Sequence, residues 1–493
     1  MTFSMSKSKY CRGVQCPKML WMDIHMPEQA EATAPEAVLR TGTEVGELAR
    51  DYFGGHVLVE FSPDKKQMCQ DTRGFMDAGE PVIAEASFLY KNNFCSVDIL
   101  RRTETEIQLI EVKSSTEVHE IYLHDMAYQY YVLTHCGISV AKVYNMHIDS
   151  SYERRGELEL DKLFRLEDCT DQILAMQRGI EENLAVIQTY LDSVPEPDRD
   201  LDLYCEKPYE CEYKRYCRRH VEEPSVFSIH RLSAKKKYQL YRQGVVTFGD
   251  VIEAKPALND RQWRQVKASY YEEPPKIDRK ALGEFLDGLT YPLYYLDFET
   301  YQQAVPGFDG VKPYMQIPFQ YSLHIQREMG AEPEHCEFLA KEGTDPRRAL
   351  AEQLCRQIPG DVCSLAYNMS FEKTVIRNLA DLYPDLSDHL MNIHSRMQDL
   401  MVPFQRQYYY CRELQGSYSI KKVLPALCGG DPELDYHGLE DIHNGSEAME
   451  AFADLPGRSG DEIRRIRKNL LAYCRLDTLA MVKILARLYE MTR

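Results

Sequence analysis

Apolar residues recur with two different spacings along this chain of 493 residues. Apolar positions every three or four residues are typical of amphipathic helices and mark residues 36–53 and 170–192. Short apolar or alternating runs bounded by turn residues are typical of strands. Such runs occupy residues 82–88, 95–100, 107–113, 294–300 and 317–325. Helices and strands mixed in this order predict an α/β fold.

Breaker-rich sequence divides the chain into parts. A length of 493 residues suggests about two to four domains at roughly 150 residues each. We predict a first domain at residues 1–222, a small helical connector at 223–285 and a second domain at 286–493. Within the connector, two short helices around a turn at Gly244 loosely resemble a helix-hairpin-helix, whose turn would offer backbone N–H groups to phosphate.

Composition adds three constraints. Apolar residues at 44% and charged residues at 28% are typical of a globular protein, and the absence of a signal peptide or a bilayer-length apolar run predicts a cytoplasmic location without a membrane partner. The net charge of −18 argues against broad coating of nucleic acid, although a nuclease needs only local basic patches. Fifteen cysteines in a chain without an export signal argue against structural disulfides and raise the alternative of a metal cluster.

Two carboxylates lie at alternate positions of the apolar run 294–300, at Asp297 and Glu299. In a strand, alternation places both side chains on one face. Adjacent buried acids repel each other unless a cation lies between them. Hard oxygen ligands of this kind suit Mg²⁺ or Mn²⁺.

A second set of charged residues follows two earlier strands. Asp98 lies on one of them, and Glu111 and Lys113 share a face of the next. The two acids can bind a divalent ion and orient water against a phosphodiester, and the lysine can stabilise the developing negative charge. The arrangement resembles the PD-(D/E)XK nuclease superfamily, which has a restriction-endonuclease-like fold, and Gln129 falls where its RecB-like branch carries a helical glutamine.

The resemblance to the RecB-like branch also implies one additional acid. Glu44 and Glu47 lie on the predicted early helix, and Glu85 competes with both. The sequence does not choose among the three.

Three cysteines stand at regular spacing in a short aromatic and charged stretch, at Cys205, Cys211 and Cys217. Buried structural cysteines usually lie in apolar runs, which this stretch is not. Cys16 is the natural fourth thiolate, with Cys11 as an alternative. One early and three late cysteines enclosing the domain resemble the iron–sulfur RecB-like nucleases, including the CRISPR adaptation and AddB-type enzymes. That resemblance implies a 4Fe–4S cluster with four thiolate ligands, and a four-cysteine zinc site is its rival.

Three blocks of the last region occur in a recognisable order. The first is the Asp297/Glu299 strand, the second an N-x-x-F sequence followed by Glu372, and the third Tyr473 and Asp477 four residues apart on a helix. Together they resemble the DEDDy exonucleases of the RNase H-like, DnaQ-like class. The second block of that class usually ends in aspartate, so Glu372 is a departure from it.

The DEDDy resemblance implies two divalent ions held by the four acids and a water oriented by the tyrosine. Asp399 is an extra or replacement acid. Phosphates would be steadied by Lys373, or by Lys421 and Lys422. The basic run of residues 464–468 is either a solvated helix face or a strand-guiding patch.

The whole chain resembles an uncharacterised bacterial nuclease family that fuses these two domains. This resemblance implies a metal-dependent nuclease with DNA as partner, processing DNA ends as an exonuclease in repair or in defence against foreign DNA. One alternative is an RNA-processing exonuclease, because the preference for a 2′-OH is not visible in these motifs. The other is a nucleic-acid-binding scaffold with only one active nuclease domain.

Overall fold

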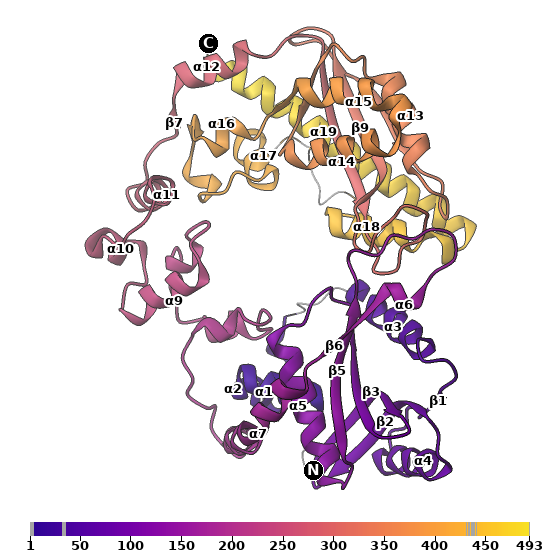
Figure 1. Cartoon of the computed structure of the whole chain (residues 1–493). Coiled ribbons are helices and arrows are strands. Elements are labelled where there is room, and N and C mark those ends of the chain that lie inside the picture. The colour runs from indigo at the N-terminus through magenta and orange to yellow at the C-terminus, as the bar shows by residue number, and fades with distance from the viewer. Residues whose placement is uncertain are drawn as a thin grey trace. The chain divides into compact units, whose positions relative to one another are not determined.

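The structure is a computed structural model that describes residues 4–31, 36–429, 431, 434, 439 and 441–492. Its packing divides the chain into two compact units, and Figure 1 colours the chain by residue number. The first unit is Met1–His220 with Gln303–Met315, and the second is Val221–Gln302 with Gln316–Arg493. The stretch 223–285, which was predicted as a separate connector, therefore groups with the second unit.

A six-stranded mixed sheet forms the centre of the first unit. Its strands, adjacent in sequence order, are β1 (Val57–Leu58), β2 (Val82–Tyr90), β3 (Asn93–Arg102), β4 (Ile107–Lys113), β5 (Val140–Ile148) and β6 (Phe164–Asp168). β4 and β5 are parallel, so the chain crosses between them through helix α5 (Glu120–His135). The neighbouring pairs on either side, β3 with β4 and β5 with β6, are antiparallel.

Helices cover both faces of this sheet. They are α1 (Lys7–Gln15), α2 (Pro17–His25), α3 (Glu36–Asp51), α4 (Lys65–Ala78), α6 (Leu160–Leu163), α7 (Thr170–Leu191) and α8 (Lys214–Cys217). On one face α1, α4, α5 and α7 bury an aromatic core in which the Tyr10 and Tyr128 rings stack at 4.9 Å. On the other face Val45 and Ala49 of α3 pack against Ile99 and Ile110. The amphipathic pattern of the early helix is thus used to cover the sheet.

The second unit begins with short helices, α9 (Ala234–Arg242), α10 (Phe248–Ala254), α11 (Asp260–Tyr270) and α12 (Arg279–Asp287). Gly244 turns the chain between the first two with φ of 75°. The backbone N–H groups of Gly244 and Val245 donate to carbonyls of α9, and those of Val246 and Thr247 donate to the Asp250 carboxylate. All four amides of this turn therefore donate to groups within the protein.

A five-stranded sheet forms the centre of the second unit. Its order is β10 (Glu334–Leu339), β9 (Ile317–Gln326), β8 (Leu293–Tyr301), β11 (Cys363–Ala366) and β12 (Met397–Asp399). β8 runs parallel to β11 and antiparallel to β9. A separate two-stranded pair joins β7 (Lys276–Ile277) to β13 (Tyr409–Tyr410).

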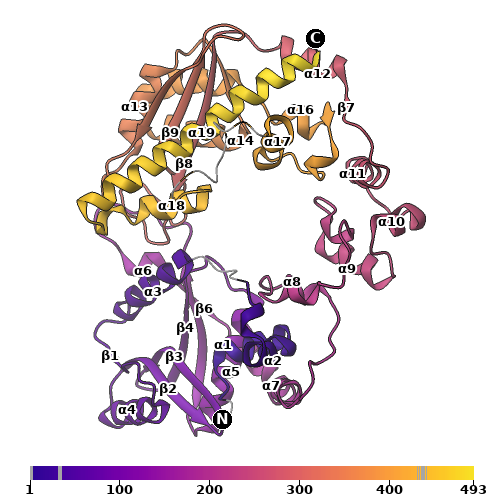
Figure 2. The same cartoon turned by 180° about the vertical axis from the view of Figure 1, so that it is seen from behind.

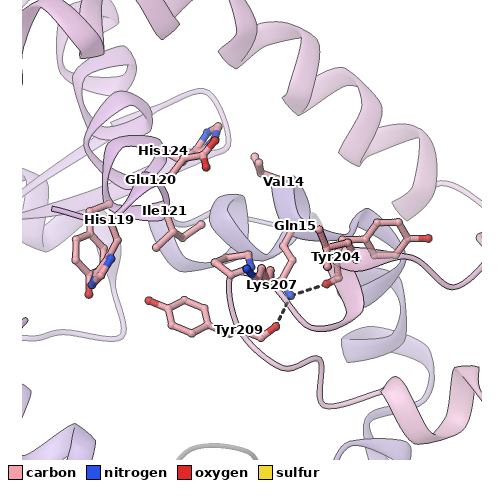
Figure 3. Close-up of a pocket in the computed structure, with 12 residues that line it drawn as sticks. Val14, Gln15, His119, Glu120, Ile121, His124, Tyr204, Lys207 and Tyr209 are labelled. Carbon is pink, nitrogen blue, oxygen red and sulfur yellow. Dashed lines mark hydrogen bonds between the residues drawn. The ribbon is translucent and has the colours of Figure 1, made fainter. Parts of the chain in front are cut away.

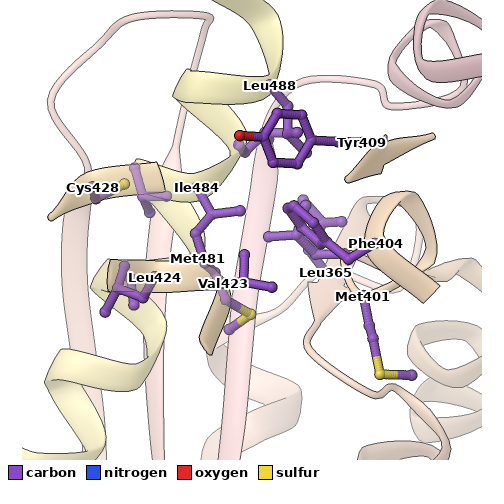
Figure 4. Close-up of a cluster of buried hydrophobic side chains, with 14 of the residues drawn as sticks. Leu365, Met401, Phe404, Tyr409, Val423, Leu424, Cys428, Met481, Ile484 and Leu488 are labelled. Atoms are coloured by element: carbon purple, nitrogen blue, oxygen red, sulfur yellow. The ribbon is translucent and has the colours of Figure 1, made fainter. Parts of the chain in front are cut away.

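Two helical layers enclose the five-stranded sheet. One contains α13 (Arg347–Gln357), α14 (Ser370–Leu382) and α15 (Pro384–Arg396). The other contains α16 (Val402–Gln405), α17 (Ile420–Cys428) and the long α19 (Gly460–Thr492), which runs the length of the sheet in Figure 2. Figure 4 shows Met481 and Ile484 of α19 near Val423 of α17, and Leu488 of α19 beside Tyr409.

Both units are layered mixtures of helices and sheets, so the expected α/β class is confirmed. Within the part of the chain that the structure describes, none of the helices combines the length and apolarity needed to cross a bilayer.

Candidate metal centres

The first acid pair lies where β3 and β4 run side by side. Asp98 of β3 accepts a hydrogen bond from the backbone N–H of Val112 at 2.8 Å, which fixes its carboxylate against β4. Glu111 of β4 is fully buried. The two acids predicted from separate strands therefore belong to one charged group.

Lys7, the first residue of α1, lies between these carboxylates. Its Nζ donates to Asp98 Oδ1 at 3.1 Å and to Glu111 Oε1 and Oε2 at 3.0 and 3.2 Å. The ammonium thus occupies the position in which two acids usually hold a cation. The sequence analysis missed this residue, and no local pattern around it could have revealed its neighbours.

Lys113 and Gln129 complete the group together with a further acid, Asp125 of α5. Lys113 Nζ donates to Glu111 at 2.7 Å and to Asp125 at 2.9 Å. Gln129 Nε2 donates to the same two carboxylates, at 2.7 and 3.0 Å. Asp125 was missed as well, although its spacing four residues before Gln129 on a helix was a usable signal.

Burial and charge separate the two acids of the pair. Burial and the neighbouring Glu111 raise the pKa of Asp98 to about 6, against the opposing effect of Lys7. Burial also opposes ionisation of Glu111, but Lys113 and Lys7 outweigh it and lower the pKa of Glu111 below its ordinary value. The lysines thus hold Glu111 ionised, whereas Asp98 is the weaker acid and takes up a proton more readily.

Of the three residues considered for the additional acid, Glu85 has the clearest link to the pair. Its charge contributes to the raised pKa of Asp98, and Arg50 of α3 donates to its carboxylate at 3.2 Å. Glu85 also has φ of 55° at an irregular point of the β2–β3 ladder. Glu44 and Glu47 are exposed on α3.

The four cysteines proposed as cluster ligands line one small cavity of about 20 Å³. Cys16 caps the N-terminus of α2, and the other three follow α7 in the stretch that ends with α8. The backbone N–H of Cys211 donates to Cys205 O at 3.0 Å. Cys16, Cys211 and Cys217 belong to an apolar cluster that also contains Trp21. Cys11 lies elsewhere, with its thiol directed to Ile121 O at 3.9 Å.

These thiols are free and line one cavity, and they fit a thiolate-bound metal group in their donor chemistry. Burial raises the pKa of Cys205 to about 11 and that of Cys211 to about 12, and the neighbouring thiols add to both shifts. Backbone N–H groups of Met19 and Lys18 favour the thiolate of Cys16. A bound cation would offset the mutual repulsion of the thiolates.

The second acid group lies on the central strand of the second unit. Asp297 and Glu299 of β8 present ligand atoms within 4.8 Å of each other and of the Cys474 thiol on α19. In the described part of the chain, this is the one trio of His, Cys, Asp and Glu side chains gathered so tightly. Cys474 Sγ lies 3.8 Å from Asp297 Oδ2. The cysteine was not singled out in the sequence, although it directly follows Tyr473.

Burial and neighbouring carboxylates dominate the electrostatics of the second acid group. Burial raises the pKa of Asp297 well above its ordinary value, and Asp477, Glu299 and Glu372 add to the shift. Burial and the Asp477 and Glu372 carboxylates raise the pKa of Glu299 to about 8, with Lys421 opposing. The acids of all three predicted blocks therefore interact electrostatically.

Glu372 and Asp399 differ in what holds them. Glu372 is 2% exposed, and burial raises its pKa to about 8, with Asp399 adding to the shift. Its Oε2 has no hydrogen-bond partner among the described residues. Asp399 Oδ1 accepts the backbone N–H groups of Asn368 at 3.0 Å and Met401 at 2.9 Å. Asp399 therefore braces the turn after β11, which leaves Glu372 as the acid available to a cation.

Beside these acids lies a cavity of about 560 Å³, lined by Glu299, Phe371, Lys421 and Asn444 among others. Of the three lysines considered as phosphate ligands, Lys421 is the one that faces Glu299, whereas Lys422 donates to Gln415 Oε1 at 2.8 Å. Tyr473 is nearly buried on α19, one turn before Asp477.

The basic run at 464–468 is largely occupied within the second unit. Arg464 pairs with Asp461, and Arg465 pairs with Asp441. Arg467 pairs with Glu342 at 3.3 Å and also donates to Leu339 O at 3.2 Å. These ion pairs favour the solvated-face interpretation over a strand-guiding patch.

Comparison with known proteins adds a partial match. The model of a family described as "Domain of unknown function (DUF2779)" matches residues 294–419, which include Asp297, Glu299 and Glu372 but not Asp477. A stretch of 187 residues is 26% identical to "Uncharacterized protein UU173" of Ureaplasma parvum serovar 3 (strain ATCC 700970). That stretch is 34% of this chain and 26% of the relative, so the chain matches about a quarter of the relative's length. No solved structure matches the chain.

Proposed function

We propose that this protein is a metal-dependent nuclease with two separate acid sites that hydrolyse phosphodiester bonds of DNA ends. The observation that carries the proposal is the cluster of buried carboxylates around Asp297. Burial raises the pKa values of Asp297, Glu299 and Glu372, and neighbouring carboxylates add to each shift, so the cluster is costly to ionise without cations. Divalent metal ions with oxygen ligands remove that cost.

The second unit would act as an RNase H-like exonuclease of the DEDDy type. Bound divalent cations supply an activated water and stabilise the charge on the departing 3′ oxygen. Asp297, Glu299, Glu372 and Asp477 hold the cations, and Tyr473 orients the water. Lys421 steadies a phosphate in the cavity beside Glu299. The three-block resemblance and the convergence of the four acids support this assignment.

The first unit would act as a PD-(D/E)XK nuclease of the RecB-like branch. Asp98 and Glu111 hold a divalent cation, and Lys113 stabilises negative charge on the phosphate. Gln129 orients Glu111 through the 2.7 Å hydrogen bond. Glu85 is the additional acid because its charge reaches Asp98.

The thiolate cavity would hold a 4Fe–4S cluster through Cys16, Cys205, Cys211 and Cys217. Tetrahedral zinc would hold four thiolates about 3.8 Å apart, since Zn–S bonds measure about 2.3 Å. No three of these four Sγ atoms lie within 4.8 Å of one another. The cavity volume of about 20 Å³ points the other way, because it suits a single ion. Rotation about the Cα–Cβ bonds changes both the spacing and the volume. The preference for the cluster therefore rests on the resemblance of the four cysteines to those of the iron–sulfur RecB-like nucleases.

A scaffold role for the first unit is the second candidate, and one observation favours it. Lys7 neutralises the Asp98/Glu111 pair from within the chain. If that ammonium stays in place when nucleic acid binds, the first unit would grip a strand and leave the cutting to the second.

The test is degradation of end-labelled DNA and of RNA of the same sequence with Mg²⁺ or Mn²⁺. We expect Asp98→Ala and Asp297→Ala each to remove a separable part of the activity on DNA, and the double variant to remove all of it. Exposed Glu104 and Glu332, changed to Ala, serve as matched controls in the two units. Wild-type rates for Asp98→Ala on every substrate would establish the scaffold role. Wild-type rates for Asp297→Ala would remove the second unit from catalysis, and faster loss of RNA than DNA would redirect the proposal to RNA processing.

A further inference from the structure

A cavity of about 660 Å³ lies in the first unit beside the acid site. Its walls come from the end of α1, the start of α5 and the loop at 203–209 (Figure 3). Pockets for nucleotide-sized ligands commonly measure about 300–1,000 Å³. The cavity is therefore large enough for a nucleoside unit.

Three tyrosines and two histidines are among the residues that line it. Tyr122 and His119 meet edge to face, with ring centroids 5.1 Å apart. Tyr209 is 57% exposed, and Figure 3 shows its ring extending from the loop toward the side of Ile121 and His119. Burial and the neighbouring Tyr122 raise the pKa of Tyr209. An exposed ring that faces a cavity is an available stacking surface.

The cavity is connected to the acid site through Lys113. The Lys113 ammonium lies 5.1 Å from the centroid of the Tyr122 ring and 2.7 Å from Glu111 Oε1. One lysine thus contacts both the aromatic wall and the proposed metal ligand. A strand whose phosphate lies at the acids would have a neighbouring base within reach of this wall.

The loop that forms the third wall is fixed to α1 by one side chain. Gln15 Nε2 donates to Tyr204 O at 2.8 Å and to Tyr209 O at 2.7 Å, as drawn in Figure 3. Cys205 lies inside this loop, and Cys16 directly follows Gln15. The proposed thiolate centre therefore holds the same two segments that shape the cavity.

We propose that this cavity binds an unpaired nucleobase of the strand that is cut at Asp98 and Glu111. Every base has a π-face, so Tyr209 and Tyr122 can stack on any sequence, and Lys207 at the rim suits the adjoining phosphate. The proposal rests on the nuclease function proposed for the first unit. It adds that this unit takes single-stranded ends or frayed duplex ends, because a paired base is not free to enter.

The test is binding of a short, 5′-labelled single-stranded deoxyoligonucleotide, with Ca²⁺ in place of the catalytic metal. Stacking contributes about 1–3 kcal/mol per base, so Tyr209→Ala should weaken binding about fivefold or more, while Tyr209→Phe keeps the ring and stays within about twofold. Tyr271, also 57% exposed but in the second unit, gives the matched control Tyr271→Ala.

A second arm replaces single nucleotides of the probe by an abasic residue. An abasic residue at one position of the probe should weaken binding to the wild-type protein. The same probe should bind Tyr209→Ala as well as the intact probe does, because that variant has already lost the stacking contact. The affinity for a fully paired duplex of the same sequence should be the same in the wild-type protein and in Tyr209→Ala.

The outcomes separate the two proposals. Equal binding by wild-type protein and Tyr209→Ala, together with lost cleavage in Asp98→Ala, overturns the base pocket and leaves the nuclease standing. If abasic probes bind as well as intact ones at every position, the pocket proposal also fails. If the wild-type protein binds no strand and Asp98→Ala changes no degradation, both proposals fall.

Discussion

The Lys7 ammonium donates to both carboxylate oxygens of Glu111, at 3.0 and 3.2 Å, across 104 positions of the sequence. The same nitrogen reaches Asp98 at 3.1 Å. Lys7 thus acts as an internal counter-ion at the place proposed for a divalent cation. The helix that begins with Lys7 ends next to Cys16, so one short helix connects the acid site with the proposed thiolate centre.

Removal of this internal cation should strengthen metal binding. A hydrogen bond to a charged group contributes about 1.5–3 kcal/mol, so in Lys7→Met we expect Mn²⁺ to bind the first unit about tenfold more tightly. The measurement is a Mn²⁺ titration followed by electron paramagnetic resonance, in an Asp297→Asn background that weakens the second site.

Lys9→Met is the matched control for Lys7→Met, because Lys9 lies on the same helix and its Nζ donates to Ser4 O rather than to the acids. Weaker Mn²⁺ binding by Lys7→Met would contradict the competition. It would show instead that the ammonium organises the two carboxylates for the metal.

The thiolate centre makes a prediction about colour. Protein purified without oxygen should be brown, with broad visible absorbance, and Cys211→Ser should lose it because one of four thiolates is missing. Cys355→Ser, in α13 of the second unit, should keep the colour. Absorbance spectra, together with analysis of iron, sulfide and zinc content, distinguish the 4Fe–4S cluster from a zinc site. Colourless wild-type protein with one zinc per chain would reverse the assignment.

The strands and their acids could be predicted from the sequence because alternation is a local property. Asp297 and Glu299 lie on one strand, and their common face follows from the two-residue repeat. Lys7 could not be predicted, because its contact with Glu111 depends on how α1 packs on the sheet. Residues 303–315 are a further example, since a loop between two strands of the second unit packs with the first.

Local charge patterns could not decide between two interpretations of one region. The run at 464–468 is compatible with a nucleic-acid patch, yet Arg465 and Arg467 find their acidic partners in distant segments, at Asp441 and Glu342. The DEDDy blocks are local motifs, and the acids of each block lie on one strand or one helix. Whether those residues are catalytic stays a prediction.

Glu372 and Asp399 should respond differently to loss of charge. Glu372→Gln removes a proposed metal ligand, so we expect the activity assigned to the second unit to fall about 100-fold with little loss of stability. Asp399→Asn weakens two hydrogen bonds to backbone N–H groups and should instead lower Tm. The measurements are degradation of a 3′-labelled strand in an Asp98→Ala background and thermal unfolding. The reverse pattern would identify Asp399 as the ligand.

The raised pKa of Glu299 gives the metal-free protein a stability that depends on pH. Its pKa is about 8 in the folded protein, against an ordinary value of 4.5, because burial and the neighbouring acids disfavour the charge. The folded state therefore holds this proton more tightly than the unfolded chain. The stability that the bound proton contributes is complete below about pH 4.5 and is lost as the pH rises to about 8.

The variant Glu299→Gln stays neutral at every pH. At pH 8 without divalent ions we therefore expect its Tm to exceed that of the wild type by at least about 2 °C, the shift that roughly 1 kcal/mol gives in a domain of this size. At pH 5 the two should unfold within about 1 °C of each other, a fraction of that shift. Addition of Mn²⁺ at pH 8 should raise the Tm of the wild type more than that of the variant, because the variant lacks one metal ligand. Differential scanning calorimetry at both pH values measures this, and a wild-type Tm that rises between pH 5 and 8 without metal would show that the acids around Asp297 are not costly to ionise.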